Sequence, residues 1–234
     1  MSYQAILFDM DGTLLPMDND EFTRVYFGLL IKAVSCHGYT GETLIPAMWK
    51  GVEAMVKNDG TENNETRFWQ VFSKIFGEEA YGHIPTFDNF YHTDFHKAKA
   101  ATQPTELSKK AVELAHKKAE RVVVATNPLF PACAIEARLS WVDLYPEDFD
   151  LVTTYENSHF CKPNPKYYLE ICEKLGLDPK KCLMVGNNTK EDVWAASQAG
   201  MDTYLVTDCL IVEGDMPDCK KGSLKELCDF LETV

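Results

Sequence analysis

A chain of 234 residues, of which 45% are hydrophobic and 25% charged, can bury a substantial core and form one large domain or two smaller ones. Its net charge of −13 at pH 7 disfavours binding to nucleic acid or to an anionic membrane surface, so neither is an expected partner. No segment approaches the roughly 18 consecutive apolar residues of a membrane span.

The eight cysteines are scattered along the chain without a CxxC pair, and most of them lie in apolar segments. This usage favours reduced thiols over disulfides or zinc ligands. The first residues of the sequence show neither a basic leader nor a small-residue cleavage site. We therefore expect a cytoplasmic protein, while its oligomeric state is not predicted by the sequence.

The first expected element is a buried strand formed by the short apolar run Ala5–Phe8. Asp9–Thr13, with the sequence DMDGT, follows directly, and Gly12 can adopt a turn that other residues resist. Ligands of open α/β sheets bind beyond the carboxyl ends of the strands. Asp9 and Asp11 therefore suit two roles, one attacking an electrophile while the other moves protons. The alternative interpretation is an Asx-type turn that only ends the strand.

From about residue 16 to residue 103, apolar side chains recur at helical spacing in four stripes. The stripes run from Phe22 to Ala33, from Leu44 to Val56, from Phe68 to Phe76 and, more weakly, from Phe87 to Phe95. Segments containing Gly and Pro separate them. We expect their aromatic side chains to form the core of a small helical bundle rather than a cofactor site.

From Pro104 onward, helix and strand signals alternate, which is typical of a parallel α/β sheet. Strands are expected at Val122–Ala125, near Leu151–Thr153, at Cys182–Val185 and at Thr203–Val206. The first two helices of this part are expected at Leu107–Lys118 and from Pro131 onward. A third lies between Asn164 and Gly176, and a fourth follows the strand Cys182–Val185 and ends at Gly200. The last helix begins at a capping box of Ser223 and Glu226. The predicted fold is thus an α/β domain of residues 1–15 and 104–234, interrupted by an all-helical domain of residues 16–103.

Three further polar sites fall at or near strand ends of the α/β part. Thr126 and Asn127 close the second strand, where a hydroxyl and an amide could hold an anionic oxygen. Lys162 precedes Pro163 just before a well-defined helix start. The loop from Gly186 to Asp192 closes the strand Cys182–Val185. Each site also has a simpler interpretation, because Thr is common in turns, Lys is usually solvated, and Thr189 with Asp192 fits a helix cap.

Taken in chain order, these residues resemble the four motifs of the haloacid dehalogenase superfamily. Its first motif, DxDGT, is matched by Asp9–Thr13, and its second, a Ser or Thr ending a hydrophobic strand, by Thr126. Its third, a Lys before Pro, is matched by Lys162, and its fourth, an acidic GDxxxxD loop, is matched in part by Gly186–Asp192. The resemblance covers the whole α/β part, and the helical insert occupies the place of the family's cap domain.

The resemblance implies a Rossmann-like core and a Mg²⁺-dependent phosphatase that acts on a small phosphorylated substrate. It implies that Asp9 attacks phosphorus to form an aspartyl-phosphate and that Asp11 serves as general acid and base. The other implied site residues are a phosphate clamp of Thr126, Asn127 and Lys162 and a metal site of Asp9, the Asp11 backbone carbonyl, Asn187 and Asp192.

Two features leave alternatives open. Asn187 stands where the family usually has an acidic metal ligand, so a binding or regulatory protein that lost turnover is the second class of function. Asp11 argues against a dehalogenase and against a phosphonoacetaldehyde hydrolase with Lys50 as the Schiff-base lysine, while a phosphomutase stays open. Substrate choice in this family lies in the cap, where the polar candidates are Arg24, Lys50, Arg67, His92 and His96.

Overall fold

The computed structural model describes residues 3–233, and its central element is a parallel six-stranded sheet. The strand order is β3-β2-β1-β4-β5-β6, and every neighbouring pair is parallel. The strands are β1 (Tyr3–Phe8), β2 (Ala119–Val124), β3 (Leu151–Val152), β4 (Cys182–Gly186), β5 (Asp202–Val206) and β6 (Lys220–Gly222). The predicted α/β fold is confirmed.

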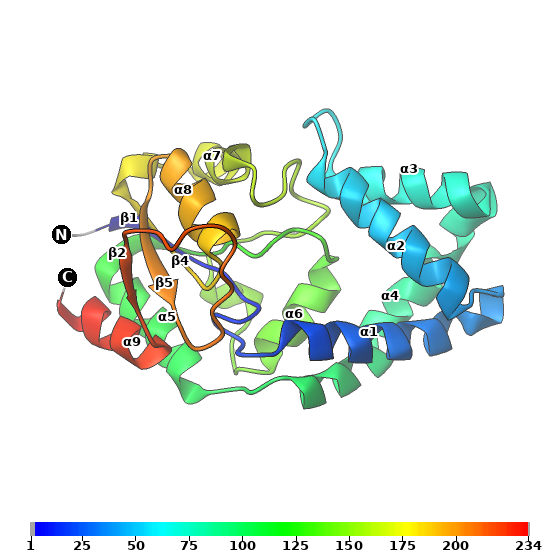
Figure 1. Ribbon diagram of the computed structural model, residues 1–234, viewed down its shortest axis with the longest axis horizontal. Coiled ribbons are helices and arrows are strands. Elements are labelled where there is room, and N and C mark those ends of the chain that lie inside the picture. The colour runs from blue at the N-terminus through cyan, green and yellow to red at the C-terminus, as the bar shows by residue number, and fades with distance from the viewer. Residues whose placement is uncertain (1–2, 234) are drawn as a thin grey trace.

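The central strands β1 and β4 are buried on both faces because helices cover each side. Alternate residues of β1 point to opposite faces, so Ile6 and Phe8 join one apolar core and Ala5 and Leu7 the other. The first core is completed by α5 (Glu106–Lys118) and α9 (Leu224–Thr233), and the second by α7 (Pro165–Leu175) and α8 (Ala195–Gln198). Figure 1 shows these two helical layers around the sheet.

The strand order places a switch point beside β1. The chain proceeds from β1 outward through β2 to β3 and then returns to add β4 on the other side of β1. The connections that leave β1 and β4 therefore diverge and open a crevice at the carboxyl ends of these strands. This edge of the sheet is where the sequence predicts the site.

Helix ends follow the expected capping chemistry. The Asn164 side chain accepts a hydrogen bond from the Lys166 N–H at 3.1 Å, and Gly176 ends α7 in the left-handed region with φ of 65°. Ser223 and Glu226 form the predicted capping box at the start of α9. The remaining elements of this part are α6 (Ala132–Ser140), the 3₁₀ segments Pro146–Asp148 and Pro179–Lys181, and a π-helical segment Thr189–Trp194 that leads into α8.

The segment between β1 and α5 is helical, as predicted, and contributes no strand to the sheet within the described residues. Its elements are α1 (Asn19–Val34), α2 (Gly41–Val56), α3 (Asn64–Phe76), α4 (Ile84–His92) and the 3₁₀ segments Ser35–His37, Glu78–His83 and Asp94–Ala101. In Figure 1 this helical insert lies beyond one end of the sheet. Its division from residues 1–15 and 104–234 as a separate domain stays a prediction, and residues 1, 2 and 234 lie outside the described chain.

Two connections join the helical insert to the sheet, and they run side by side. Met17 and Thr102 form an antiparallel bridge, and the Gln103 N–H donates to the Pro16 carbonyl at 2.8 Å. Paired strands of this kind can act as a hinge, because small backbone rotations at both crossings move the insert as a unit. Among residues 3–233, no helix combines the length and the apolar character needed to cross a bilayer.

The insert also contacts the α/β part directly at the start of α3. The Asn64 N–H donates to the Ser158 carbonyl and the Glu65 N–H to the Tyr155 carbonyl, each at 2.9 Å. The first N–H groups of a helix have no partner within the helix, so the loop that precedes Lys162 satisfies two of them. Any opening of the insert must break these bonds.

We expect Asn64→Ala to weaken this contact. The Asn64 side chain is fully buried, accepts from Asn58 Nδ2 at 2.9 Å and donates to the Pro128 carbonyl at 3.3 Å. Its removal leaves buried polar partners unsatisfied, which should lower the free energy of unfolding by about 1–3 kcal/mol. Urea unfolding measures this loss, with the exposed Asn89→Ala on α4 as the matched control. Equal stability of the two variants would contradict a stabilising contact at α3.

Two strand predictions differ from the structure. The sequence indicated a strand at Val122–Ala125, whereas β2 begins three residues earlier, at Ala119, and ends at Val124. β6 was missed because Lys220-Lys221-Gly222 carries no apolar run, and its position at the edge of the sheet tolerates charged side chains.

Candidate active site

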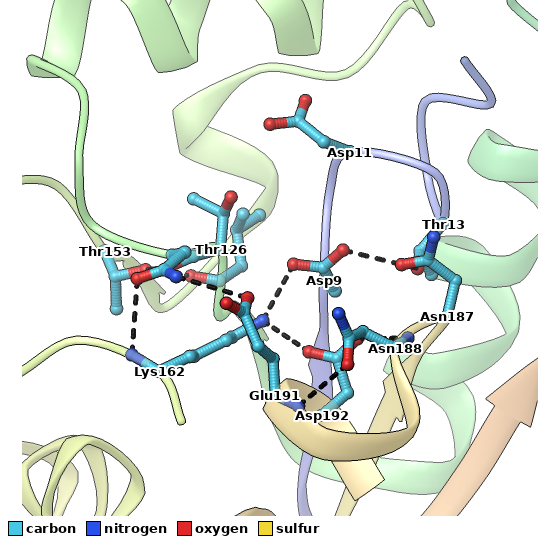
Figure 2. A network of polar contacts seen from close by, with 12 residues as sticks. Asp9, Asp11, Thr13, Thr126, Thr153, Lys162, Asn187, Asn188, Glu191 and Asp192 are labelled. Atoms are coloured by element: carbon cyan, nitrogen blue, oxygen red, sulfur yellow. Dashed lines mark hydrogen bonds and ion pairs between the residues drawn. The ribbon is translucent and has the colours of Figure 1, made fainter. Parts of the chain in front are cut away.

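Polar side chains from distant parts of the sequence meet at the carboxyl ends of the central strands (Figure 2). Asp9 directly follows β1, Thr126 lies two residues after β2, and Asn187 directly follows β4. Lys162 reaches the same place from the loop between β3 and α7, where its peptide bond to Pro163 is cis. The structure therefore brings the residues of the four sequence motifs together.

Lys162 is the centre of a buried ion-pair cluster. Its Nζ lies 2.8 Å from Asp9 Oδ1 and 2.6 Å from Asp192 Oδ1. Lys162 and Asp192 are each 1% exposed and Asp9 is 7% exposed, so the three charges are shielded from solvent. When both carboxylates are ionised, one ammonium leaves an excess of one negative charge, which favours an additional cation at this end of the site.

The cluster shifts the pKa values of its members. Burial raises the pKa of Asp9 to about 8, against the lowering effect of Lys162 and with a further increase from Asp192. Burial lowers the pKa of Lys162, but Asp192 and Asp9 outweigh it and hold that pKa well above its usual range. Lys162 is therefore a permanent positive charge, whereas a bound cation would favour the ionised form of Asp9.

Asn187 directs its amide oxygen toward the site. Thr13 Oγ1 donates to Asn187 Oδ1 at 3.3 Å and lies 3.4 Å from Asp9 Oδ2, while Asn187 Nδ2 donates to the Cys209 carbonyl at 2.6 Å. A Cβ on Gly12 would lie 2.2 Å from Asn187 Nδ2, so the DMDGT turn and the β4 loop require glycine here. Gly12 has φ of 85°, which confirms the turn expected of it.

The oxygen atoms in this corner suit a hard cation. Asp9 Oδ2 and Asn187 Oδ1 approach the same Thr13 hydroxyl, so a carboxylate and an amide oxygen converge. Both are ligand types that Mg²⁺ accepts. Within residues 3–233, no group of three or more His, Cys, Asp and Glu side chains is arranged to hold a metal ion. The Asp9 carboxylate and the Asn187 amide oxygen fit Mg²⁺, but they bring less negative charge than a site of three carboxylates.

Asp192 connects the β4 loop to Lys162. Its Oδ1 accepts from Lys162, and its Oδ2 accepts from the Asn188 N–H at 2.9 Å. A Cβ on Gly186 would lie 2.3 Å from Asp192, so this close approach also requires glycine. The N-cap of the following helix is Asn188 and not Thr189, because the Asn188 side chain accepts from the first helical N–H groups. Asp192 contributes to this cap as well, since its Oδ2 accepts from the backbone N–H of Asn188.

Thr126 and Asn127 hold the β2 loop in place. The Thr126 carbonyl accepts from Thr153 Oγ1 and from the Tyr167 hydroxyl, each at 2.8 Å. Asn127 Oδ1 accepts from the Lys162 backbone N–H at 3.2 Å, and its Nδ2 donates to Glu191 Oε2 at 3.2 Å. The backbone of Lys162 is therefore fixed by the neighbouring loop. Binding of phosphate by Thr126, Asn127 and Lys162 stays a prediction.

Asp11 lies apart from this cluster (Figure 2). It forms a salt bridge with Arg138 of α6. Arg138 is fully buried, its Nε donates to the Ala134 carbonyl at 3.2 Å, and its guanidinium stacks 4.4 Å from the Phe130 ring centre. Within the described chain, Asp11 Oδ1 and Arg138 Nη2 are buried without hydrogen-bond partners. Asp11 also lines the cavity described below, so its unpaired Oδ1 has a free bonding position at the site.

Arg138 and Glu191 were missed at the sequence level. Arg138 is a charged residue among Ala134, Ile135 and Leu139 on an apolar helix, which is the only local signal that it has a buried partner. Glu191 lies in the same Gly186–Asp192 loop as Asn187, and its hydrogen bond with Asn127 depends on the tertiary fold. No helical or strand periodicity in the sequence predicts the Arg138–Asp11 or the Glu191–Asn127 contact.

A cavity of about 330 Å³ lies between the site and the helical insert. Asp9, Asp11, Thr126 and Asn187 line one end, and α1–α4 supply most of the other. None of the five polar insert residues singled out from the sequence, Arg24, Lys50, Arg67, His92 and His96, is among its lining residues. Aromatic side chains such as Tyr26 and Phe87, which we expect only in the core of the helical bundle, line it instead.

This combination of fold and site defines a class of hydrolase. The family described as haloacid dehalogenase-like hydrolase matches residues 3–200, and the chain belongs to that family. It is 30% identical over 211 residues to the pyrimidine 5′-nucleotidase PynA of Streptococcus pneumoniae, covering 87% of this chain and 83% of PynA. It is 26% identical over 238 residues to the pyrophosphatase PpaX of Bacillus cereus, covering 100% and 99% of the two chains.

Among solved structures, the 2-haloacid dehalogenase of Pseudomonas syringae matches with a TM-score of 0.68 and 18% identity, over 98% of each chain. A likeness at this identity shows the shared fold. The choice between dehalogenase and phosphatase chemistry therefore depends on the site residues, above all on Asp11.

Proposed function

We propose that this hydrolase cleaves small phosphate monoesters through an aspartyl-phosphate intermediate on Asp9. The observation that carries the proposal is the burial of Asp9 against Lys162, with a second carboxylate, Asp11, two residues further along the same turn. PynA and PpaX support it, because both names describe hydrolysis of phosphate compounds. The cytoplasm, with its reducing conditions and phosphorylated metabolites, is the expected location.

In the first step, Asp9 attacks phosphorus and the bond to the leaving-group oxygen breaks. Lys162 holds Asp9 Oδ1 and so fixes the orientation of the carboxylate for this attack. Asp11 donates a proton to the departing oxygen, which then leaves as a neutral alcohol. In the second step, Asp11 accepts a proton from water as that water attacks the acyl-phosphate and releases inorganic phosphate.

Lys162, Thr126 and Asn127 would hold the phosphoryl oxygens during both steps. The Lys162 ammonium supplies a fixed charge that needs no reorganisation when negative charge develops. Mg²⁺, held by Asp9, the Asp11 backbone carbonyl, Asn187 and Asp192, would supply the positive charge that lets an anionic phosphate approach a carboxylate. A protein with a net charge of −13 needs such local cations to bind an anion at all.

Hydrolysis of 4-nitrophenyl phosphate, with Mg²⁺ or with a chelator, tests the proposal. We expect release of phosphate that depends on the metal. The absence of activity at every Mg²⁺ concentration and over a broad panel of phosphate esters would instead support a binding or regulatory protein. Transfer of the phosphoryl group to another hydroxyl group of a phosphorylated sugar, rather than to water, would indicate a phosphomutase.

We expect Asn187→Asp to tighten Mg²⁺ binding by about tenfold, because an anionic ligand attracts a divalent cation more strongly than a neutral amide does. The amide oxygen already faces Asp9, so the substitution places a carboxylate oxygen at the same position. The concentration of Mg²⁺ that gives half-maximal activity measures the effect. Asn89→Asp, which adds the same charge on the exposed surface of α4 outside the cavity, is the control. Equal behaviour of both variants would mean that Asn187 does not hold the metal.

A further inference from the structure

The end of the cavity that faces the helical insert is lined mainly by aromatic rings. Ten aromatic side chains line the cavity, and eight of them come from α1–α4. Trp69 and Phe87 pack edge to face with ring centres 5.4 Å apart, and Tyr26 and Phe130 do so at 5.5 Å. The Tyr26 and Tyr91 hydroxyls bond to each other at 2.9 Å, so these rings present mainly their carbon surfaces. The leaving group of the substrate would enter this aromatic end.

The charged side chains that line the cavity are acidic. Five carboxylates line it, those of Asp9, Asp11, Asp88, Glu191 and Asp192, and no Lys, Arg or His is among its lining residues in the described chain. At the aromatic end, a leaving group that carries a carboxylate or a second phosphate would meet Asp88 and no cation among the lining residues of the described chain. Anionic leaving groups are therefore disfavoured.

Asp88 differs from the other four carboxylates. Asp9 and Asp192 bind Lys162, Asp11 binds Arg138, and Glu191 accepts from Asn127. Asp88, on α4, makes no hydrogen bond or salt bridge within residues 3–233, although it lines the aromatic end. Its carboxylate is therefore available to a ligand.

The surroundings of Asp88 make a bound cation favourable. Burial raises the pKa of Asp88, and so does the nearby Glu156, while His92 one turn along α4 lowers it. Glu65 of α3 lies close enough to be affected by both Asp88 and Glu156. His92 is exposed and does not line the cavity, so it places no positive charge inside it. Each of these acids gains from a positive charge in the cavity.

We propose that the substrate of this enzyme is a phosphate monoester whose leaving group carries a positively charged nitrogen, bound among the aromatic rings and against Asp88. This inference rests on the proposed phosphatase function and specifies its substrate class. Aromatic faces attract cations through the negative charge above the ring, most strongly when water is excluded. Asp88 adds a direct charge interaction, and the hydrolysis product is an ammonium alcohol plus inorganic phosphate.

Two pairs of esters that differ mainly by one charge test the proposal. Choline phosphate is paired with 3,3-dimethylbutyl phosphate, in which carbon replaces the quaternary nitrogen, and 2-aminoethyl phosphate is paired with propyl phosphate. We expect kcat/KM for the cationic member to exceed that for its neutral partner by at least about tenfold in one or both pairs. Equal rates within both pairs, or a preference for the neutral members, would overturn the inference.

Asp88→Asn supplies the second measurement. We expect it to reduce the ratio of the two kcat/KM values within the preferred pair about fivefold or more, because the carboxylate contacts only the charged ester. Glu42→Gln removes the same charge from the exposed surface of α2 and should leave the ratio unchanged. An unchanged ratio in Asp88→Asn would exclude Asp88 as the recognising group.

Hydrolysis of 4-nitrophenyl phosphate by the wild-type enzyme distinguishes a failure of the proposed substrate class from a failure of the proposed phosphatase function. Activity on this aryl ester without any preference for cationic esters means that the substrate class is wrong while the phosphatase function stands. No activity on any ester means that the phosphatase function itself is wrong.

Discussion

Asp9→Asn is expected to reduce phosphatase activity by at least about 10³-fold, because an amide cannot form the aspartyl-phosphate that the proposed reaction requires. The substitution is nearly isosteric. Asn retains an oxygen to accept from Lys162 at the Oδ1 position, and the Thr13 hydroxyl can accept from the new amide nitrogen. We therefore expect a folded protein without turnover, measured by phosphate release and by the thermal unfolding midpoint.

Trapping of the intermediate distinguishes this role from simple charge stabilisation. Wild-type protein mixed with substrate and quenched in acid should gain the mass of one phosphoryl group on the peptide that contains Asp9, and Asp9→Asn should gain none. Residual activity of one tenth in the variant would show that the covalent mechanism is wrong. Labelling of the variant on another carboxylate would place the nucleophile elsewhere.

The positions of the predicted site residues follow from the topology of a parallel sheet. Asp9, Thr126 and Asn187 each come just after a short apolar run in the sequence. Runs of this kind are buried strands, and in a parallel sheet their carboxyl ends lie at one edge. Asp9, Thr126 and Asn187 could therefore be predicted from the sequence without knowledge of contacts between distant residues.

The contacts of Asp11 and the shape of the cavity could not be predicted in this way. The pair between Asp11 and Arg138 joins residues 127 positions apart, and it depends on how α6 packs against the turn after β1. Helical periodicity shows that Tyr26 and Phe87 lie on apolar faces, but it does not show whether an apolar face contacts another helix or a cavity. The position of these aromatic side chains at the cavity is therefore visible only in the structure.

Asp11→Asn is expected to affect substrates according to their leaving groups. An alkoxide leaves poorly without a proton, so loss of the general acid should reduce activity on alkyl phosphates by about 10²–10⁴-fold. 4-Nitrophenolate leaves readily without protonation, so the first step on its phosphate ester should slow far less. The ratio of the two losses, measured as kcat/KM for a simple alkyl phosphate and for 4-nitrophenyl phosphate, reports on the role of Asp11.

The contact with Arg138 supplies the control for this experiment. Asn retains an oxygen that accepts from Arg138, so Asp11→Asn changes the proton-transfer group while it preserves an acceptor for the buried guanidinium. Arg138→Lys changes the same pair from the other side and leaves the Asp11 carboxyl able to transfer a proton, so we expect it to reduce activity on both esters to a similar extent. Equal losses on both esters in Asp11→Asn as well would mean that Asp11 positions the site and does not protonate the leaving group.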